Sequence, residues 1–219
     1  MVPGVSTNTL SLPEAQLSAP EHDLLRAARE GDHRRAQALL EAGVRADVHD
    51  RDGRRPLTLA AERGHVEAMR VLVQAGAPLD MRDAGKTPWT ALMHALHADR
   101  AGAALALLEW GADPDVSEDS GYSALMMAAS RGDPWVVDEL LTRGADAGAQ
   151  LFLGFTALDY AIGYGHLDVV RILLDAAPEV LARHNPARRA VLALAEKAGD
   201  AKILELLASY ESGQIADSA

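Results

Sequence analysis

The stretch that decides the fold reads Pro-Leu-Thr-Leu-Ala-Ala-Glu-Arg-Gly-His, from Pro56 to His65. Its leucine recurs at steps of 33, 35, 33, 33 and 34 residues, giving the series Leu24, Leu57, Leu92, Leu125, Leu158 and Leu192. In most copies small apolar residues follow the leucine after three and four positions, and a glycine follows after seven. A sequence period of this size indicates stacked supersecondary units.

Each unit is predicted to contain a helix, a turn, a second helix and a protruding turn. The glycine ends the first helix, because it adopts the left-handed conformation of a C-terminal cap at little cost. A second apolar set has helical spacing, and its clearest copy is Val136, Val137, Leu140 and Leu141. Aspartate and glycine precede the next leucine in several copies, as at Asp47 and Gly53, and such residues favour turns.

The repeat resembles the ankyrin repeat. Pro56 to Ala61 and Gly64-His65 match the first-helix and turn motifs of that family, and Gly111-Ala112-Asp113 and Gly144-Ala145-Asp146 match its closing segment. The resemblance covers residues 21–210 and implies an all-α solenoid of about six repeats including caps, with units beginning near residues 21, 50, 83, 118, 151 and 185. It also implies that His65 and His166 hydrogen-bond within their own turns.

The ends and the third copy depart from the pattern. Residues 1–20 are predicted to be a flexible leader, and residues 211–219 a flexible tail. The third copy has Asp99 in place of the glycine, and two extra residues around Lys86, Thr87 and Pro88 predict an irregular turn tip. The fifth copy ends in Ala177-Pro178, which suits the approach to a terminal cap.

Composition narrows the class of protein. The chain has 219 residues, 48% hydrophobic and 4% aromatic, and no cysteine, which excludes disulfide scaffolds and thiol catalysis. Residues 1–20 contain no basic residue and no sustained apolar run, so we expect neither a cleaved signal peptide nor a membrane span. A cytoplasmic location is the expectation.

Charge is unevenly distributed along the chain. The formal net charge is −11. Residues 26–70 hold ten arginines against eight acids, whereas residues 71–219 hold eleven basic residues against twenty-one acids. This excess disfavours nucleic acid and favours a basic protein as the partner, although acidic surfaces also serve solubility.

The sequence offers little for catalysis or metal binding. His94 and His97 form an H-x-x-H pair one helical turn apart, but no third ligand accompanies them, so we interpret them as a partly exposed helix pair. Ser123 and Ser130 lack a histidine and an acid at any motif spacing. We expect no metal, no cofactor and no small-molecule substrate. An enzyme whose site is assembled from distant residues remains the alternative of a different class.

The turn tips are predicted to bind a partner. Three positions before the leucine stand Arg54, Trp89, Tyr122 and Phe155. The resemblance implies that this position projects from the turn and that positions five and six after the leucine line the adjoining concave face. Aromatic residues and arginine are enriched in the energetic centres of interfaces. The predicted partner-binding residues are Arg51, Arg54, Arg55, Trp89, His97, Asp119, Tyr122, Arg131, Phe152, Leu153, Phe155 and Tyr164.

Other large side chains are assigned to packing. Trp135 is predicted to pack on the outer surface at the start of a second helix. Leu59, Met127 and Tyr160, two positions after the leucine, are assigned to the core of the inner helices.

The functional prediction is a non-catalytic protein-binding module. Lysine occurs only at positions 86, 197 and 202, whereas arginine and alanine are abundant, as in a GC-rich bacterial coding sequence. An inhibitor or immunity partner of a bacterial toxin is therefore one hypothesis for its role. A secreted effector that binds a host protein is the competing hypothesis.

Overall fold

The structure, a computed structural model, describes residues 17–85, 88–151, 154–182, 189, 192–193, 195–197 and 199–212. These residues form an all-α solenoid, as the spacing predicts. The helices follow one another in pairs: α1 (Ala19–Glu30) with α2 (His33–Glu41), α3 (Pro56–Arg63) with α4 (Val66–Gln74), α5 (Ala91–His97) with α6 (Ala101–Glu109), α7 (Ala124–Arg131) with α8 (Pro134–Thr142), and α9 (Ala157–Gly163) with α10 (Leu167–Ala176). The last repeat contributes α11 (Glu179–Ala182) and α13 (Ala201–Glu211).

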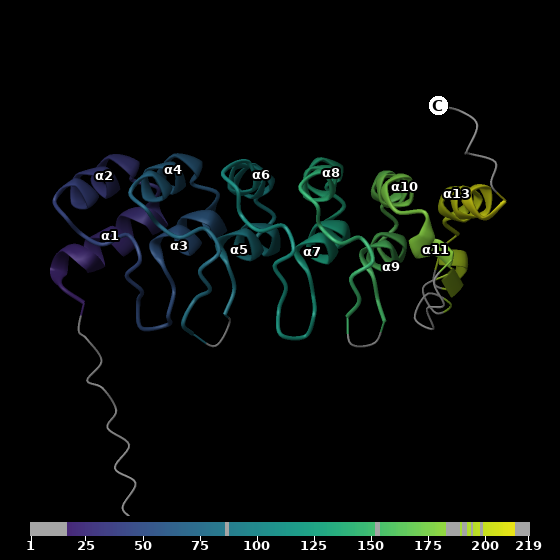
Figure 1. Ribbon diagram of the computed structural model, residues 1–219, viewed down its shortest axis with the longest axis horizontal. Coiled ribbons are helices and arrows are strands. Elements are labelled where there is room, and N and C mark those ends of the chain that lie inside the picture. Colours follow the sequence, from purple (N-terminus) through teal and green to yellow (C-terminus); the bar gives the residue numbers. More distant parts are fainter. Residues whose placement is uncertain are drawn as a thin grey trace, which may run out of the picture.

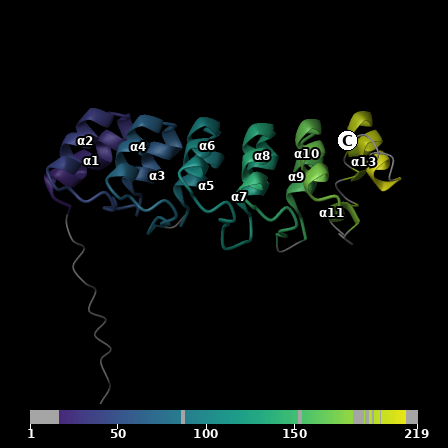
Figure 2. The ribbon, with the colours of Figure 1, turned by 45° about the horizontal axis from the view of Figure 1, so that its top comes forward.

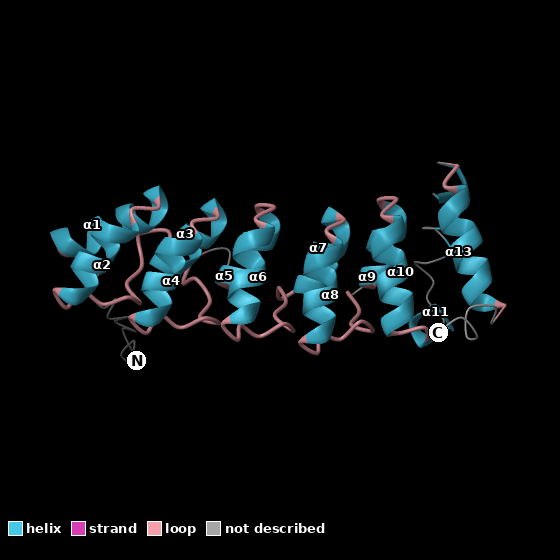
Figure 3. Ribbon diagram, turned by 90° about the horizontal axis from the view of Figure 1, so that it is seen from above, coloured by secondary structure: helices cyan, strands magenta, loops and turns pink. Residues whose placement is uncertain are grey.

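The repeats stack side by side in two layers. The odd-numbered helices α1 to α9 form an inner row, the even-numbered helices α2 to α10 form an outer row above it in Figure 1, and the long turns project below the inner row. The tilted view keeps the same order of repeats from α1 to α13 (Figure 2). Seen from above, the outer helices lie next to one another along the whole stack (Figure 3). No helix among the described residues is long and apolar enough to cross a membrane.

The recurring leucine is buried in each inner helix, and it is the second residue of α3, α5, α7 and α9. Leu24, Leu92 and Leu125 are 0%, 0% and 1% exposed. The alanines that follow each leucine are buried too, and their small side chains allow the helices of neighbouring repeats to approach closely. Because a repeat cannot bury this face alone, the core is continuous along the stack.

Hydroxyl residues start most of the inner helices. The side chains of Ser18, Thr90, Ser123 and Thr156 accept hydrogen bonds from the first turns of α1, α5, α7 and α9. The predicted leader boundary at residue 20 is therefore wrong, because α1 begins at Ala19 and is capped by Ser18. At the other end, α13 includes Glu211, which the prediction placed in the tail.

The turns within the repeats are tied to the preceding repeat. His166 Nε2 lies 3.1 Å from the carbonyl oxygen of Ser130, and Arg100 Nε donates to the carbonyl oxygen of Glu62 at 3.3 Å. A side chain on Gly132 would meet the His166 ring at 2.4 Å, so this glycine makes room for the histidine. The prediction that His166 bonds within its own turn is wrong, because its ring lies against the repeat before it.

The irregular third repeat accepts its hydrogen bond from a different kind of donor in the fourth repeat. Asp99 adopts the left-handed conformation with φ 57° in place of the usual glycine. Asp133 occupies the position that holds His166 in the next repeat, and a carboxylate cannot donate to a carbonyl oxygen. The guanidinium of Arg131 instead donates to the carbonyl oxygen of His97.

The first two protruding turns touch through their backbones. Ala84 N donates to the carbonyl oxygen of Gly53 at 2.9 Å. Gly53 has φ 78°, and a Cβ built on it would lie 2.2 Å from the backbone nitrogen of Gly85. Lys86 and Thr87, where the irregular tip was predicted, lie outside the described residues.

We expect Gly53→Ala to destabilise the fold by about 1 kcal/mol more than Gly76→Ala. Both glycines have positive φ, but a Cβ on Gly76 has no atom within 4 Å. Both variants carry the cost of a side chain at positive φ, so the difference between them measures the clash with the neighbouring turn. Overpacking of this kind adds about 1 to 3 kcal/mol. Urea unfolding of the two variants measures the difference. Equal losses would contradict the close contact between the turns.

Candidate functional site

Aromatic rings of the fourth and fifth repeats gather on the side that carries the inner helices and turns. Tyr122 ends the turn before α7, and Phe155 ends the turn before α9. The rings of Tyr122 and Tyr160 contact each other across the boundary between the repeats, with centroids 5.2 Å apart and planes tilted by 52°. Phe155 contacts Tyr160 at 6.2 Å. These three rings and Tyr164 are called the aromatic surface below.

Tyr164 is the exposed member of the aromatic surface. Its side chain follows α9 and is 64% exposed, and one ring face stacks on His166 at 6.2 Å and 18°. Burial raises the pKa of Tyr122, and the neighbouring groups Tyr164 and Glu118 raise it further, against the hydrogen bond to Ser130. The phenol therefore stays neutral at physiological pH.

The third repeat carries a separate, smaller group of rings. Trp89 lies in the turn before α5, and its ring contacts His97 at 4.7 Å and His94 at 5.3 Å. Trp89 is half-buried, whereas His97 is exposed at the end of α5. The tryptophan therefore offers only one side to a partner.

An acidic turn lies beside the aromatic rings. Residues 113–123 contain Asp113, Asp115, Glu118 and Asp119 and no basic residue. Asp119 is exposed at the tip. Two aspartates at equivalent positions link neighbouring turns: Asp80 Oδ1 accepts from Asp113 N at 2.9 Å, and Asp115 Oδ1 accepts from Asp146 N at 2.8 Å. Some acids of this turn therefore stabilise the contact between neighbouring turns, and others are exposed to solvent.

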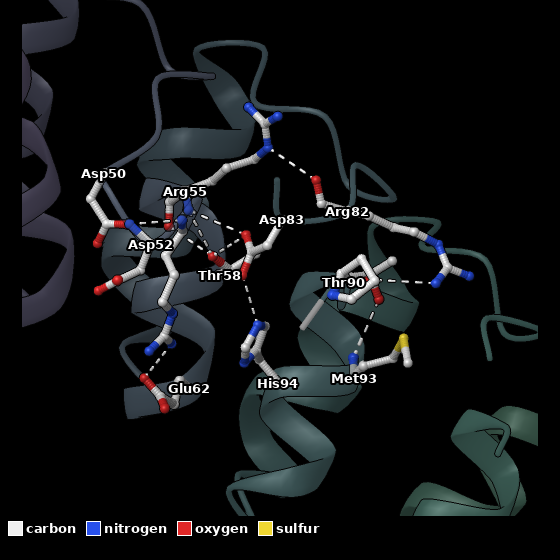
Figure 4. A network of polar contacts seen from close by, with 12 residues as sticks. Asp50, Asp52, Arg55, Thr58, Glu62, Arg82, Asp83, Thr90, Met93 and His94 are labelled. Atoms are coloured by element: carbon white, nitrogen blue, oxygen red, sulfur yellow. Dashed lines mark hydrogen bonds and ion pairs between the residues drawn. The ribbon is translucent and has the colours of Figure 1, made fainter. Parts of the chain in front are cut away.

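The arginines of the second tip are mostly committed to the fold. Arg54 pairs with Glu62 at 2.5 Å, and Arg55 NH1 donates to the carbonyl oxygen of Asp47 at 2.5 Å. Arg55 Nε also donates to the carbonyl oxygen of Arg82 in the next turn, as Figure 4 shows. Arg54 and Arg55, both predicted to bind a partner, thus have guanidinium groups that are hydrogen-bonded within the chain.

A buried polar group joins the second and third repeats. Asp83 Oδ2 lies 2.8 Å from His94 Nε2, and Asp83 Oδ1 lies 2.9 Å from the hydroxyl of Thr58 (Figure 4). The carboxyl group of Asp83 and the ring of His94 are almost completely buried. His94 is therefore not the partly exposed helix residue that the H-x-x-H pair suggested.

The predicted partner-binding residues divide into three groups in the structure. Exposed are Arg51, His97, Asp119, Arg131 and Tyr164, although the Arg131 guanidinium is bonded to the preceding repeat. Half-buried are Arg54, Arg55, Trp89, Tyr122 and Phe155. Phe152 and Leu153 lie outside the described residues. Trp89, Tyr122 and Phe155, which were predicted to project from the turns, are thus less exposed than expected, because each ring packs on its own or the next inner helix.

Two residues of this surface were missed by sequence reasoning. Tyr160 was assigned to the core, as Leu59 and Met127 were, but it is half-buried while the other two are 1% and 3% exposed. Its spacing of four from Tyr164 places both rings on one side of α9, a signal that the sequence does contain. Glu118 carried no motif, and only its position beside Tyr122 and Tyr160 identifies it.

Trp135 also differs from its predicted packing role. It lies at the start of α8 in the outer row and is 76% exposed. It is therefore a free aromatic side chain away from the inner helices, and it provides a control for the aromatic surface.

The alkaline titration of the tyrosines should report their burial. Burial raises the pKa of Tyr160 above its usual value of 10 and acts in the same direction on Tyr122, while burial and the neighbouring Asp175 raise that of Tyr210 to about 12. Because the folded-state pKa values of these tyrosines are raised, their neutral phenols contribute to the free energy of unfolding below pH 10. This contribution is lost as the pH rises through the raised pKa values. In ultraviolet difference spectra, we expect the phenolate absorbance of Tyr122 to develop above pH 10 in the wild type and to be missing from the Tyr122→Phe variant. If the absorbance that the variant lacks develops at or below pH 10 in the wild type, the burial of Tyr122 is contradicted.

Within the part of the chain that the structure describes, no group of three or more His, Cys, Asp or Glu side chains could hold a metal ion. The polar groups nearest the aromatic surface bind each other: the Tyr122 hydroxyl lies 3.1 Å from Ser130 Oγ, and Arg131 donates to a backbone oxygen. The geometry is that of a repeat solenoid which presents side chains to another molecule.

Comparison with known proteins places this solenoid in a family. The family model for ankyrin repeats (3 copies) matches residues 24–118, 103–184 and 125–217. The chain belongs to the ankyrin-repeat family, and it is a protein–protein interaction module.

Individual relatives share the repeats within longer chains. A putative ankyrin repeat-containing protein of Treponema pallidum is 31% identical over 141 residues, 64% of this chain and 47% of that protein. SH3 and multiple ankyrin repeat domains protein 2 of Homo sapiens is 34% identical over 149 residues, 67% of this chain and 8% of that protein. An L-asparaginase of Dirofilaria immitis is 33% identical over 151 residues, 68% of this chain and 25% of the enzyme. This chain therefore spans less than half of each relative, and the enzyme's name carries no catalytic assignment to it.

Proposed function

We propose that this interaction module captures its protein partner on the aromatic surface. The observation that carries the proposal is the 64% exposure of Tyr164 beside the half-buried rings of Tyr122 and Tyr160. Tyrosine supplies a large contact area with little loss of rotamer freedom and is enriched among the residues that dominate binding energy. Trp89 and His97 form a separate group on the third repeat, and Arg51 and Asp119 are polar residues at the turn tips.

The partner that we propose is a basic protein, such as a bacterial toxin that this chain neutralises in the cytoplasm by covering its surface. The net charge of −11 supports a basic partner, because complementary charge accelerates encounter. The excess of arginine over lysine and the relative from Treponema pallidum support a bacterial setting. A partner held on these rings needs no chemistry from this chain, so the proposed role is non-catalytic.

A pull-down from the native host with the intact chain tests the site. Tyr164→Ala removes the exposed ring of the aromatic surface, and Trp135→Ala removes an equally exposed ring from the outer row. We expect Tyr164→Ala to weaken capture by about 30-fold, as for an aromatic residue that dominates an interface. Trp135→Ala should retain the partner at wild-type yield.

Neither substitution should change the free energy of unfolding by more than about 0.5 kcal/mol, because both side chains are largely exposed. Binding and folding can therefore be separated. Retention of the same partner by Tyr164→Ala, or equal loss in both variants, would contradict the proposed site.

A further inference from the structure

The rings of the aromatic surface are packed against one another and stay partly accessible to solvent. Tyr122 and Tyr160 are tilted by 52° to one another, and Phe155 and Tyr160 by 50°. Each of these rings is half-buried and packs against the hydrophobic core, so part of its surface stays accessible to solvent. Tyr164 has His166 against one face and is otherwise exposed. The negatively polarised faces of aromatic rings attract cations.

The backbone of the acidic turn pairs Glu118 with Tyr122. Glu118 N donates to the carbonyl oxygen of Tyr122 at 3.0 Å, and Gly121 N donates to the carbonyl oxygen of Glu118 at 2.9 Å. This pairing fixes Glu118 beside Tyr122. Burial raises the pKa of Tyr160, and the neighbouring phenols and the Glu118 carboxylate raise it further.

Two basic side chains near this group are hydrogen-bonded to backbone oxygens. The first, Arg82, donates from NH2 to the carbonyl oxygen of Ser117, next to Glu118, at 2.6 Å. The second, Arg131, lies within electrostatic reach of Tyr122. Its guanidinium donates to the carbonyl oxygen of His97, which belongs to the third repeat, whereas Tyr160 and Tyr164 belong to the fifth. The rings and Glu118 therefore form a neutral and acidic position without an internal cation bonded to them in the described residues.

We propose that this position holds an arginine side chain of the protein partner, with its guanidinium over the ring of Tyr164 and paired with Glu118. A guanidinium suits both contacts, because it is planar, stacks on aromatic faces, binds a carboxylate through two N–H groups and is less strongly hydrated than an ammonium. This inference rests on the proposed function, since it names the group that the same surface recognises. It also gives the acidic turn a role in selecting the partner.

The test titrates the intact chain with a short synthetic peptide of arginine, glycine and serine. The control peptide carries citrulline at each arginine position, which preserves the shape and removes the charge. We expect the citrulline peptide to bind at least about tenfold more weakly, by fluorescence anisotropy. Tyr164→Leu should weaken binding of the arginine peptide about fivefold, while Tyr164→Phe, which keeps a ring, stays within about twofold of wild type.

A charge-matched pair of variants separates local pairing from general attraction. Glu118→Gln and Asp138→Asn each remove one negative charge, and Asp138 is exposed on α8 in the outer row. We expect Glu118→Gln to weaken binding of the arginine peptide at least about fivefold more than Asp138→Asn. Equal effects of the two variants would overturn the inference, as would unchanged binding by Tyr164→Leu.

Capture of the native partner distinguishes failure of this inference from failure of the proposed function. If Tyr164→Ala loses the native partner while Tyr164→Leu keeps it, the contact is apolar, and the arginine site is overturned although the proposed surface stands. If Tyr164→Ala keeps the native partner, the proposed surface fails, whichever way the peptide binds.

Discussion

Leu125→Ala should lower the free energy of unfolding by about 2 to 5 kcal/mol, the range for truncating a buried leucine. Leu125 is 1% exposed in α7, which packs between α5 and α9 in the middle of the stack. The surrounding helices cannot fill the cavity, because rigid neighbouring repeats flank it on both sides. Urea unfolding monitored by circular dichroism measures the loss.

Leu39→Ala provides the comparison for this prediction. Leu39 is half-buried in α2, in the first repeat, which has a neighbour on one side only among the described residues. Its truncation should cost less than that of Leu125, since less apolar area leaves water there on folding. A Leu125→Ala variant as stable as the wild type would show that the repeat register is misassigned.

Asp83→Ala should destabilise the chain by about 3 kcal/mol, the second large effect that we expect. The substitution removes the acceptor of His94 Nε2 and a partner of the Thr58 hydroxyl, and both of those residues are buried. A buried donor left without an acceptor costs about 1 to 3 kcal/mol, and here the contact also joins the second repeat to the third. Asp119→Ala, at an exposed tip, should change stability by less than about 0.5 kcal/mol.

A double-mutant cycle can assign this loss to the pair. If Asp83 and His94 act together, the combined variant Asp83→Ala with His94→Ala should be clearly less destabilised than the sum of the single variants. Additive effects would show that the two side chains do not depend on one another. Hydrogen exchange should also increase first in the turn that contains Asp83, because that turn would lose its link to Thr58.

The predictions from the sequence were most accurate where the residue pattern lies within one repeat. The spacing from Leu57 to Gly64 predicts a helix and its end, and α3 runs from Pro56 to Arg63 with Gly64 in the left-handed conformation. The pair Tyr160 and Tyr164 is equally local, since both lie on one side of α9. Tyr164 lies at a position predicted to line the concave face, and its side chain is exposed. Periodicity within one repeat was therefore enough to identify this side chain as a surface residue.

The predictions were wrong where a side chain can either face solvent or bond to another part of the stack. Arg51, Arg54 and Arg55 look alike in the sequence, yet only Arg51 is exposed. Arg55 is drawn inward by a carbonyl oxygen of the following turn, at Arg82. No property of the local stretch specifies that acceptor, because it is supplied by a residue in another repeat.

The sequence by itself determined the repeating unit, the helix ends and the buried leucines, because these follow from backbone preferences and apolar spacing within about one repeat length. Only the tertiary structure decided which polar and aromatic side chains remain available to a partner. Stacking brings Asp83 to Thr58, and Tyr122 to Tyr160. Each such contact replaces hydration with a partner from another repeat, and that exchange depends on distances that exist only once the repeats have stacked.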